Sequence, residues 1–95
     1  MNYTTDSLRI NALACGIPEY MIGGLVRWID NHIEPGDFLR AVLSNDLRAA
    51  CERADETNRY CIFDYVNFLH NHAPSDCWGS PEKMGAWFMP ERAPS

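Results

Sequence analysis

Thiols and imidazoles are the side chains of this sequence best suited to chemistry, and it holds four cysteines and three histidines. Structural zinc sites usually bring two ligands within two to four residues of each other, and no two cysteines here are that close. The one local cluster is His70, His72 and Cys77. Histidines two residues apart point about 200° away from each other on a helix, so they would share a metal only where the helix frays.

The same three residues would form the centre of a small metal- or thiol-dependent enzyme, because a thiol beside an imidazole base suits nucleophilic catalysis. No motif of known mechanism surrounds Cys77, however, and a structural cysteine beside Trp78 explains it as well. We therefore predict no catalytic residue, no metal and no cofactor, and keep this enzyme as an alternative.

Carboxylates, glycines and basic residues offer weaker candidates. Asp55 and Glu56 are neighbouring carboxylates, but they stand at a predicted helix start, where capping accounts for them. Gly23 and Gly24 lie inside an apolar helical pattern, whereas a phosphate-binding loop places its glycines between a strand and a helix. The eight basic side chains are scattered, and the net charge is −5, which disfavours nucleic acid or an anionic membrane as the main partner. A DNA-binding regulator of the helix-turn-helix type is the second alternative.

The elements that would position these residues are short helices. The chain has 95 residues, of which 46% are apolar and 22% charged, as in ordinary globular proteins. No stretch alternates apolar and polar residues as a strand does. The sequence therefore predicts one all-α domain over residues 1–95, a compact bundle of four to six short helices, with residues 1–5 and 90–95 flexible.

Caps and turn residues mark where these helices begin and end. We expect helices from near Asp6 to a closing Gly16, from Pro18 to about His32, over 38–43, over 47–51, from Asp55 to about residue 70, and from Pro81 to a stop at Pro90. Their buried positions are expected to include Cys15, Ile33, Leu47, Cys51, Phe63 and Val66. The fifth helix, apolar over most of its circumference, is placed at the centre of the bundle. Gly23 and Gly24 are expected to permit close approach of another backbone.

The cellular compartment is inferred from the termini and the cysteines. The first residues carry neither the basic nor the apolar region of a secretory signal, and no apolar run approaches the ~20 residues that span a bilayer. Four cysteines would allow two disulfides, but their wide spacing favours reduced thiols in a cytoplasm.

Protein–protein binding requires the least special chemistry, because exposed aromatic anchors and a polar rim are enough. The last third of the chain concentrates large apolar side chains, which either cover the bundle or contact a partner. The acidic segment over 46–64 is either a solvated helix face or a surface for a basic partner. The predicted partner-binding residues are Trp78, Trp87, Phe88, Met89, Glu52, Asp55 and Glu56.

Three strings of the sequence carry a family resemblance: Pro-Gly-Asp-Phe-Leu-Arg-Ala-Val-Leu-Ser-Asn-Asp-Leu at 35–47, Arg-Ala-Asp-Glu-Thr-Asn at 53–58, and Cys-Trp-Gly-Ser-Pro-Glu-Lys at 77–83. Over about residues 18–88 the chain resembles a family of short uncharacterised proteins of tailed bacteriophages and prophages. That family has no established activity, so no functional residue is transferred. The resemblance implies a phage accessory protein in the bacterial host cytoplasm that inhibits or redirects a host or defence protein, in the manner of an anti-CRISPR. The expected partner is a host protein, or a second copy of the chain in a homodimer.

Overall fold

The computed structural model describes residues 4–88. Within them the chain forms α-helices and two short 3₁₀ helices, with no strand, which confirms the predicted all-α bundle. The elements are α1 (Thr5–Ala14), α2 (Glu19–Asn31), α3 (Asp37–Leu43), α4 (Leu47–Arg53), η1 (Asn58–Tyr60), α5 (Ile62–His72), η2 (Ser75–Cys77) and α6 (Pro81–Phe88).

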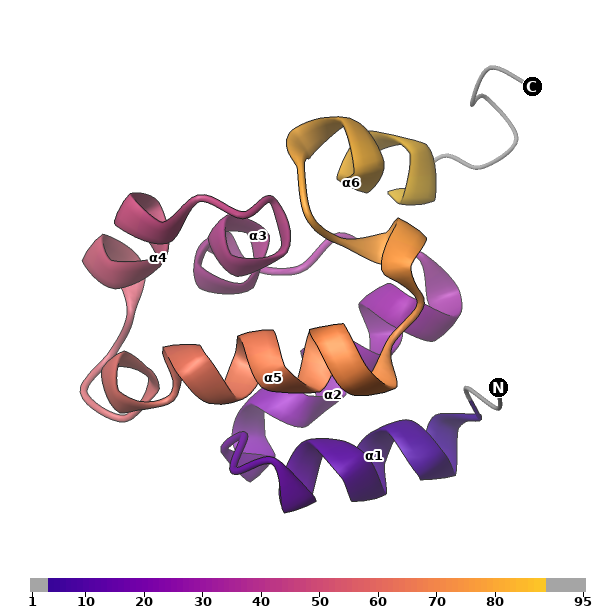
Figure 1. The fold of residues 1–95 in the computed structure, drawn as a ribbon, viewed down its shortest axis with the longest axis horizontal. Helices are drawn as coiled ribbons and strands as arrows, with labels where there is room; N and C mark the ends of the chain where they lie inside the picture. The colour runs from indigo at the N-terminus through magenta and orange to yellow at the C-terminus, as the bar shows by residue number, and fades with distance from the viewer. Residues whose placement is uncertain (1–3, 89–95) are drawn as a thin grey trace.

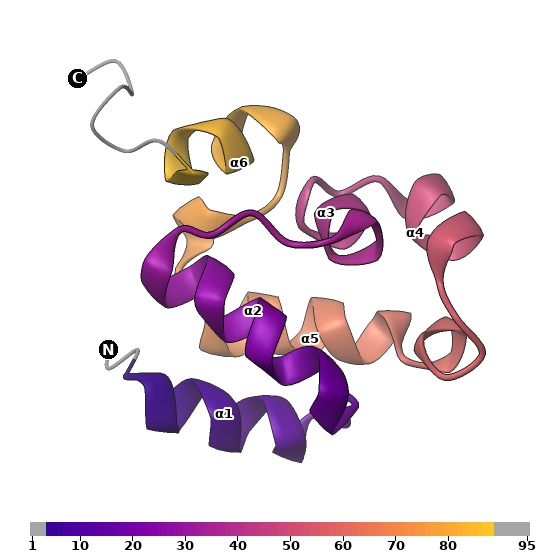
Figure 2. The same cartoon turned by 180° about the vertical axis from the view of Figure 1, so that it is seen from behind.

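The helices surround one core. Figures 1 and 2 show α5 lying along α1, with α2 crossing beside both, while α3 and α4 lie on the other side of α5. The short helix α6 lies beyond η2, next to α3 and the end of α2 (Figure 1). The last helix therefore lies against helices from the first half of the chain, and a binding site can form where they meet.

The core is built on α5 and α2. Tyr65, Phe68 and Leu69 of α5 have no exposed surface, and the ring of Phe38 meets that of Tyr65 edge to face at 5.3 Å between centroids. The Tyr65 hydroxyl donates a 2.7 Å hydrogen bond to Asn58 Oδ1, so the polar end of this buried ring is satisfied. The expected central place of this helix is only partly right, because Phe63 on its outer face is 76% exposed.

The predicted closing glycine of the first helix is confirmed, and side-chain caps account for the starts of two other helices. Gly16 closes α1 with a φ of +97°, a conformation that glycine adopts without strain. Asp46 caps α4 by accepting from the Ala49 N–H at 3.0 Å. Ser80 caps α6 in the same way, accepting from the Lys83 N–H at 3.1 Å.

One predicted cap and one predicted helix start are wrong. Thr4, not Asp6, caps α1 by accepting from the Ser7 N–H at 3.2 Å, and the helix itself begins at Thr5, next to the predicted start. The fifth helix begins at Ile62 and not at Asp55. The Asp55 carboxylate does accept hydrogen bonds from the backbone N–H groups of Thr57 and Asn58, but these bonds stabilise the turn before η1 and not the start of α5.

Besides Phe63, four side chains expected in the core are exposed, namely Ile33, Leu47, Cys51 and Val66, and Cys15 is half-buried. The expected close approach of a second backbone at Gly23 and Gly24 is also wrong. A Cβ at Gly24 would meet the Leu39 side chain at 3.5 Å, and one at Gly23 would meet the guanidinium of Arg27. The two glycines face side chains, so packing between backbones does not explain them.

Candidate functional site

The helix α6 is held in place by three contacts to distant parts of the chain. The Gly79 N–H, just before the helix, donates to the Leu43 carbonyl at 2.7 Å. At the other end, the Trp87 indole N–H donates to the Trp28 carbonyl at 3.0 Å. His32 Nδ1 lies 2.6 Å from the Trp87 carbonyl oxygen, and because a carbonyl only accepts, Nδ1 carries the proton. These contacts fix α6 against α2 and α3.

Trp28 of α2 is the buried residue on which this corner is built. It is 1% exposed, and its indole N–H donates to the Cys77 carbonyl at 2.9 Å. The ring of Phe88 stacks on it, with 6.5 Å between centroids and 21° between planes. One indole therefore connects α2, η2 and α6.

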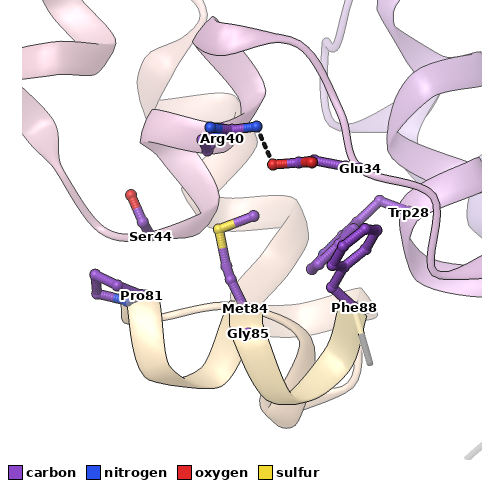
Figure 3. A pocket seen from close by; sticks show the side chains of 8 residues that line it. All are labelled: Trp28, Glu34, Arg40, Ser44, Pro81, Met84, Gly85 and Phe88. Carbon is purple, nitrogen blue, oxygen red and sulfur yellow. Dashed lines mark hydrogen bonds and ion pairs between the residues drawn. The ribbon is translucent and has the colours of Figure 1, made fainter. Parts of the chain in front are cut away.

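A hollow of about 370 Å³ opens between α6, α3 and the segment that joins α2 to α3 (Figure 3). We call it the α6 hollow. In Figure 3 the side chains of Met84 and Phe88 extend from α6 toward α3, and Arg40 and Glu34 lie across from them. It is lined by Trp28, Glu34, Arg40, Ser44, Pro81, Met84, Gly85 and Phe88.

The lining has an apolar side and a polar side. Trp28 and Met84 are buried and form the floor of this side, and the 39% exposed Phe88 supplies most of its apolar surface. On the polar side Arg40 donates from Nη2 to Glu34 Oε1 in an ion pair, and both side chains are about half exposed. Apolar walls with a few polar groups are typical of binding sites, and about 370 Å³ lies within the usual size range.

The predicted aromatic residues take different positions around α6. Phe88 lines the α6 hollow. Trp87 is half-buried and turned inward, its ring 4.7 Å from that of His32 between centroids. Trp78 is half-buried and lines a second hollow, of about 240 Å³, with His70 and Lys83. Met89 lies outside the described residues.

The predicted acidic residues are all exposed and lie elsewhere. Glu52 forms an i,i+4 ion pair of 3.6 Å with Arg48 on α4, and the side chain of Glu56 is 97% exposed. Asp55 Oδ2 accepts a 2.6 Å hydrogen bond from the Tyr20 hydroxyl. Figure 1 shows α4 and the turn that follows it at the end of the molecule away from α6. The acidic and aromatic residues therefore do not form one surface.

The hydrogen bond between Tyr20 and Asp55 affects the titration of both groups. Because the hydroxyl donates to the carboxylate, it lowers the pKa of Asp55, and backbone N–H groups of Asn58 and Thr57 lower it further. The same bond raises the pKa of Tyr20, since losing the hydroxyl proton would break it. The pair joins the start of α2 to the turn after α4.

The thiol and imidazole candidates differ in burial and in the groups that they contact. Cys77 has no exposed surface, and burial raises the pKa of its thiol to about 12, so the nucleophilic thiolate is scarce at neutral pH. His70 is exposed, and the His72 ring stacks on Phe68 at 6.1 Å between centroids. Among residues 4–88, no three side chains of the His, Cys, Asp and Glu types come close enough to hold one metal ion.

Several residues of the α6 hollow were not predicted as functional. The sequence pattern places Trp28 and Met84 on the apolar faces of their helices, and nothing in it marks Arg40 or Glu34 as functional. Their pairing across the turn before α3 depends on how the chain reverses there. The one local signal is Gly85, a residue without a side chain one turn from Pro81 on the same face of α6.

Comparison of this chain with family models, curated proteins and solved structures finds no match. Within residues 4–88, no helix is both long and apolar enough to cross a membrane.

Proposed function

We propose that this chain acts by binding another protein, and that the α6 hollow is the main contact. The observation that carries the proposal is an aromatic side chain, Phe88, standing 39% exposed over the buried Trp28 and Met84 at the edge of a hollow. Protein interfaces are dominated by a few large side chains that insert into such desolvated pockets. The site needs no reactive group, in keeping with the buried thiol of Cys77.

The framework around the hollow also suits binding. Hydrogen bonds hold α6 at both ends, to Leu43 at its start and to Trp28 near its finish. A site on a fixed helix loses little conformational entropy when a partner arrives, which favours affinity. The hollow is therefore formed before the partner binds.

The biological setting we propose follows the family resemblance. The protein would be a phage accessory factor in the host cytoplasm that inhibits or redirects a host or defence protein. Its net charge of −5 favours a partner with a basic surface. The exposed carboxylates on and after α4, including Glu52 and Glu56, would then raise the rate of association with that partner without being part of the binding surface.

A variant that fills the hollow tests the proposal. Gly85 lines the hollow, and a Cβ built there meets no atom within 4 Å, so Gly85→Leu adds a side chain without a clash at that atom. The matched control is Ala86→Leu, which adds the same bulk at the next, exposed position, outside the hollow lining. Circular dichroism and thermal melting would establish that both variants fold.

The assay is quantitative affinity capture from a bacterial lysate with the wild-type chain and both variants immobilised. We expect one saturable partner that the wild type and Ala86→Leu retain alike, and that Gly85→Leu loses by at least tenfold. Failure to recover any saturable partner would contradict protein binding. Equal capture by Gly85→Leu would remove the α6 hollow from the contact.

A further inference from the structure

We infer that the α6 hollow takes one large, uncharged apolar side chain of a peptide segment, and that Glu34 and Arg40 bind the peptide groups beside that side chain. This inference rests on the proposed function and specifies the chemistry of the partner at the same site. It follows from how the two sides of the hollow differ.

The apolar side selects the anchor. Trp28, Met84 and Phe88 offer ring and thioether surface and no polar side-chain atom that points to the opening, since the Trp28 indole N–H is already bound to the Cys77 carbonyl. A polar group placed against this wall would lose its water without gaining a partner. An aromatic or branched aliphatic side chain would gain apolar contact mainly with the exposed ring of Phe88, which Trp28 and Met84 support from below.

The polar side argues against a charged anchor. The Glu34 and Arg40 side chains carry opposite charges and lie in direct contact, so this wall is close to neutral. A charged side chain of the partner would meet one attractive and one repulsive group of this pair. It would therefore gain no net attraction to offset the water that it loses on entering the hollow.

Peptide groups match this wall, because each offers one N–H donor and one carbonyl acceptor. The Glu34 carboxylate bonds Arg40 through Oε1, and a carboxylate has lone pairs for further donors. The Arg40 guanidinium has five N–H donors and bonds Glu34 through Nη2, so others are available for a carbonyl. The complement of the wall is a neutral group with a donor and an acceptor side by side.

The size of the hollow limits the occupant to a short piece of chain. A volume of about 370 Å³ lies near the lower end of the range for ligand sites, which extends to about 1,000 Å³. One large side chain and the peptide groups on either side of it suit that space, whereas a whole helix face would not. The remaining contact with the partner must therefore spread over the rim.

Capped amino acids test this inference with the full chain. The probes are the N-acetyl amides of phenylalanine, leucine, lysine and glutamate, added at millimolar concentrations to protein labelled at its methionine methyl groups. The readout is the ¹H–¹³C shift of the Met84 methyl, which lies in the hollow. We expect saturable shifts with the phenylalanine and leucine amides, at least tenfold weaker binding of the two charged amides, and no saturable shift in Gly85→Leu.

A second variant tests the polar wall. Glu34→Gln with Arg40→Gln removes the ion pair, and we expect it to weaken binding of the phenylalanine amide severalfold while keeping the preference for apolar over charged probes. The matched control is Arg48→Gln with Glu52→Gln, which removes an exposed ion pair on α4 and should leave binding unchanged.

Three results would overturn the inference: no saturable shift with any probe, binding of a charged amide as tight as that of the phenylalanine amide, or unchanged binding in Gly85→Leu. These results are separate from the capture experiment. A partner that is captured by the wild type and lost by Gly85→Leu, with no selective binding of the probes, would uphold protein binding and reject the peptide anchor.

Discussion

Replacing Trp28 with phenylalanine tests whether one buried indole holds the α6 corner together. The indole N–H donates to the Cys77 carbonyl at a buried position, and phenylalanine has no donor to replace it. Leaving that carbonyl buried and unpaired costs about 1–3 kcal/mol. The smaller ring also leaves a cavity, which adds roughly 1 kcal/mol. We expect Trp28→Phe to lower the free energy of unfolding by about 2–4 kcal/mol, a large share of the total of about 5–15 kcal/mol typical of native proteins.

Trp87→Phe is the matched control, because it removes the same indole donor at a half-buried position. The bond it breaks ends on the Trp28 carbonyl, which also accepts from the His32 N–H at 3.1 Å and so keeps a partner. The loss should therefore stay within about 0.5–1.5 kcal/mol, the net value of an ordinary hydrogen bond. Urea unfolding followed by circular dichroism measures both variants. If their free energies of unfolding differ by less than about 0.5 kcal/mol, the Cys77 carbonyl is reached by water and the reasoning fails.

Three further predictions concern a helix, a thiol and a carboxyl group. Gly24→Ala should raise the free energy of unfolding by about 0.5–1 kcal/mol, since the new methyl group makes only an ordinary contact at 3.5 Å; a lower melting temperature in calorimetry would mean closer packing than the structure has. The Cys77 thiol should stay inert to Ellman's reagent until urea unfolds the chain, while the exposed Cys51 reacts at once and the half-buried Cys15 and Cys61 react more slowly; modification of all four thiols in the folded chain would contradict the burial of Cys77. Tyr20→Phe should raise the pKa of Asp55 toward its ordinary value in an NMR titration, and an unchanged pKa would contradict the role of the hydrogen bond. Because folding lowers the pKa of Asp55, the stability that its carboxylate adds is present above the unfolded-state pKa and is lost as the pH falls through the folded-state pKa.

The parts of the fold that could be predicted depend on residues close together in the chain. Ser80 followed by Pro81 predicts a helix start, because a serine oxygen caps the N–H groups and proline needs no donor there, and α6 begins at Pro81. Local chemistry also explains the start of α4, which the Asp46 side chain caps, and the end of α1, which Gly16 closes with a positive φ. At Asp55 the same logic located the cap correctly and the helix wrongly, because an Asx cap also stabilises a short turn that ends before a helix begins.

Burial was harder to predict, because it depends on which side of a helix the rest of the chain covers. The fifth helix is apolar over most of its circumference, and nothing local distinguishes Phe68, which has no exposed surface, from Phe63, which is 76% exposed. Leu47 begins a helix of seven residues, which is too short for its apolar periodicity to define a buried face. The contacts that decide these cases come from helices elsewhere in the sequence.

The α6 hollow could not be predicted for the same reason, yet its composition explains why it persists. Arg40 and Phe88 come from distant helices that meet only because α6 is fastened to both α2 and α3. A hollow of this kind lowers stability, since its walls lack the contacts that a filled core would supply. Glycine in a helix costs roughly 1 kcal/mol relative to alanine, and at Gly85 even a methyl group would meet no obstacle within 4 Å. An open wall and a helix-weakening residue at the same position both reduce folding stability, so their coexistence is easier to understand if the space they leave is used for binding.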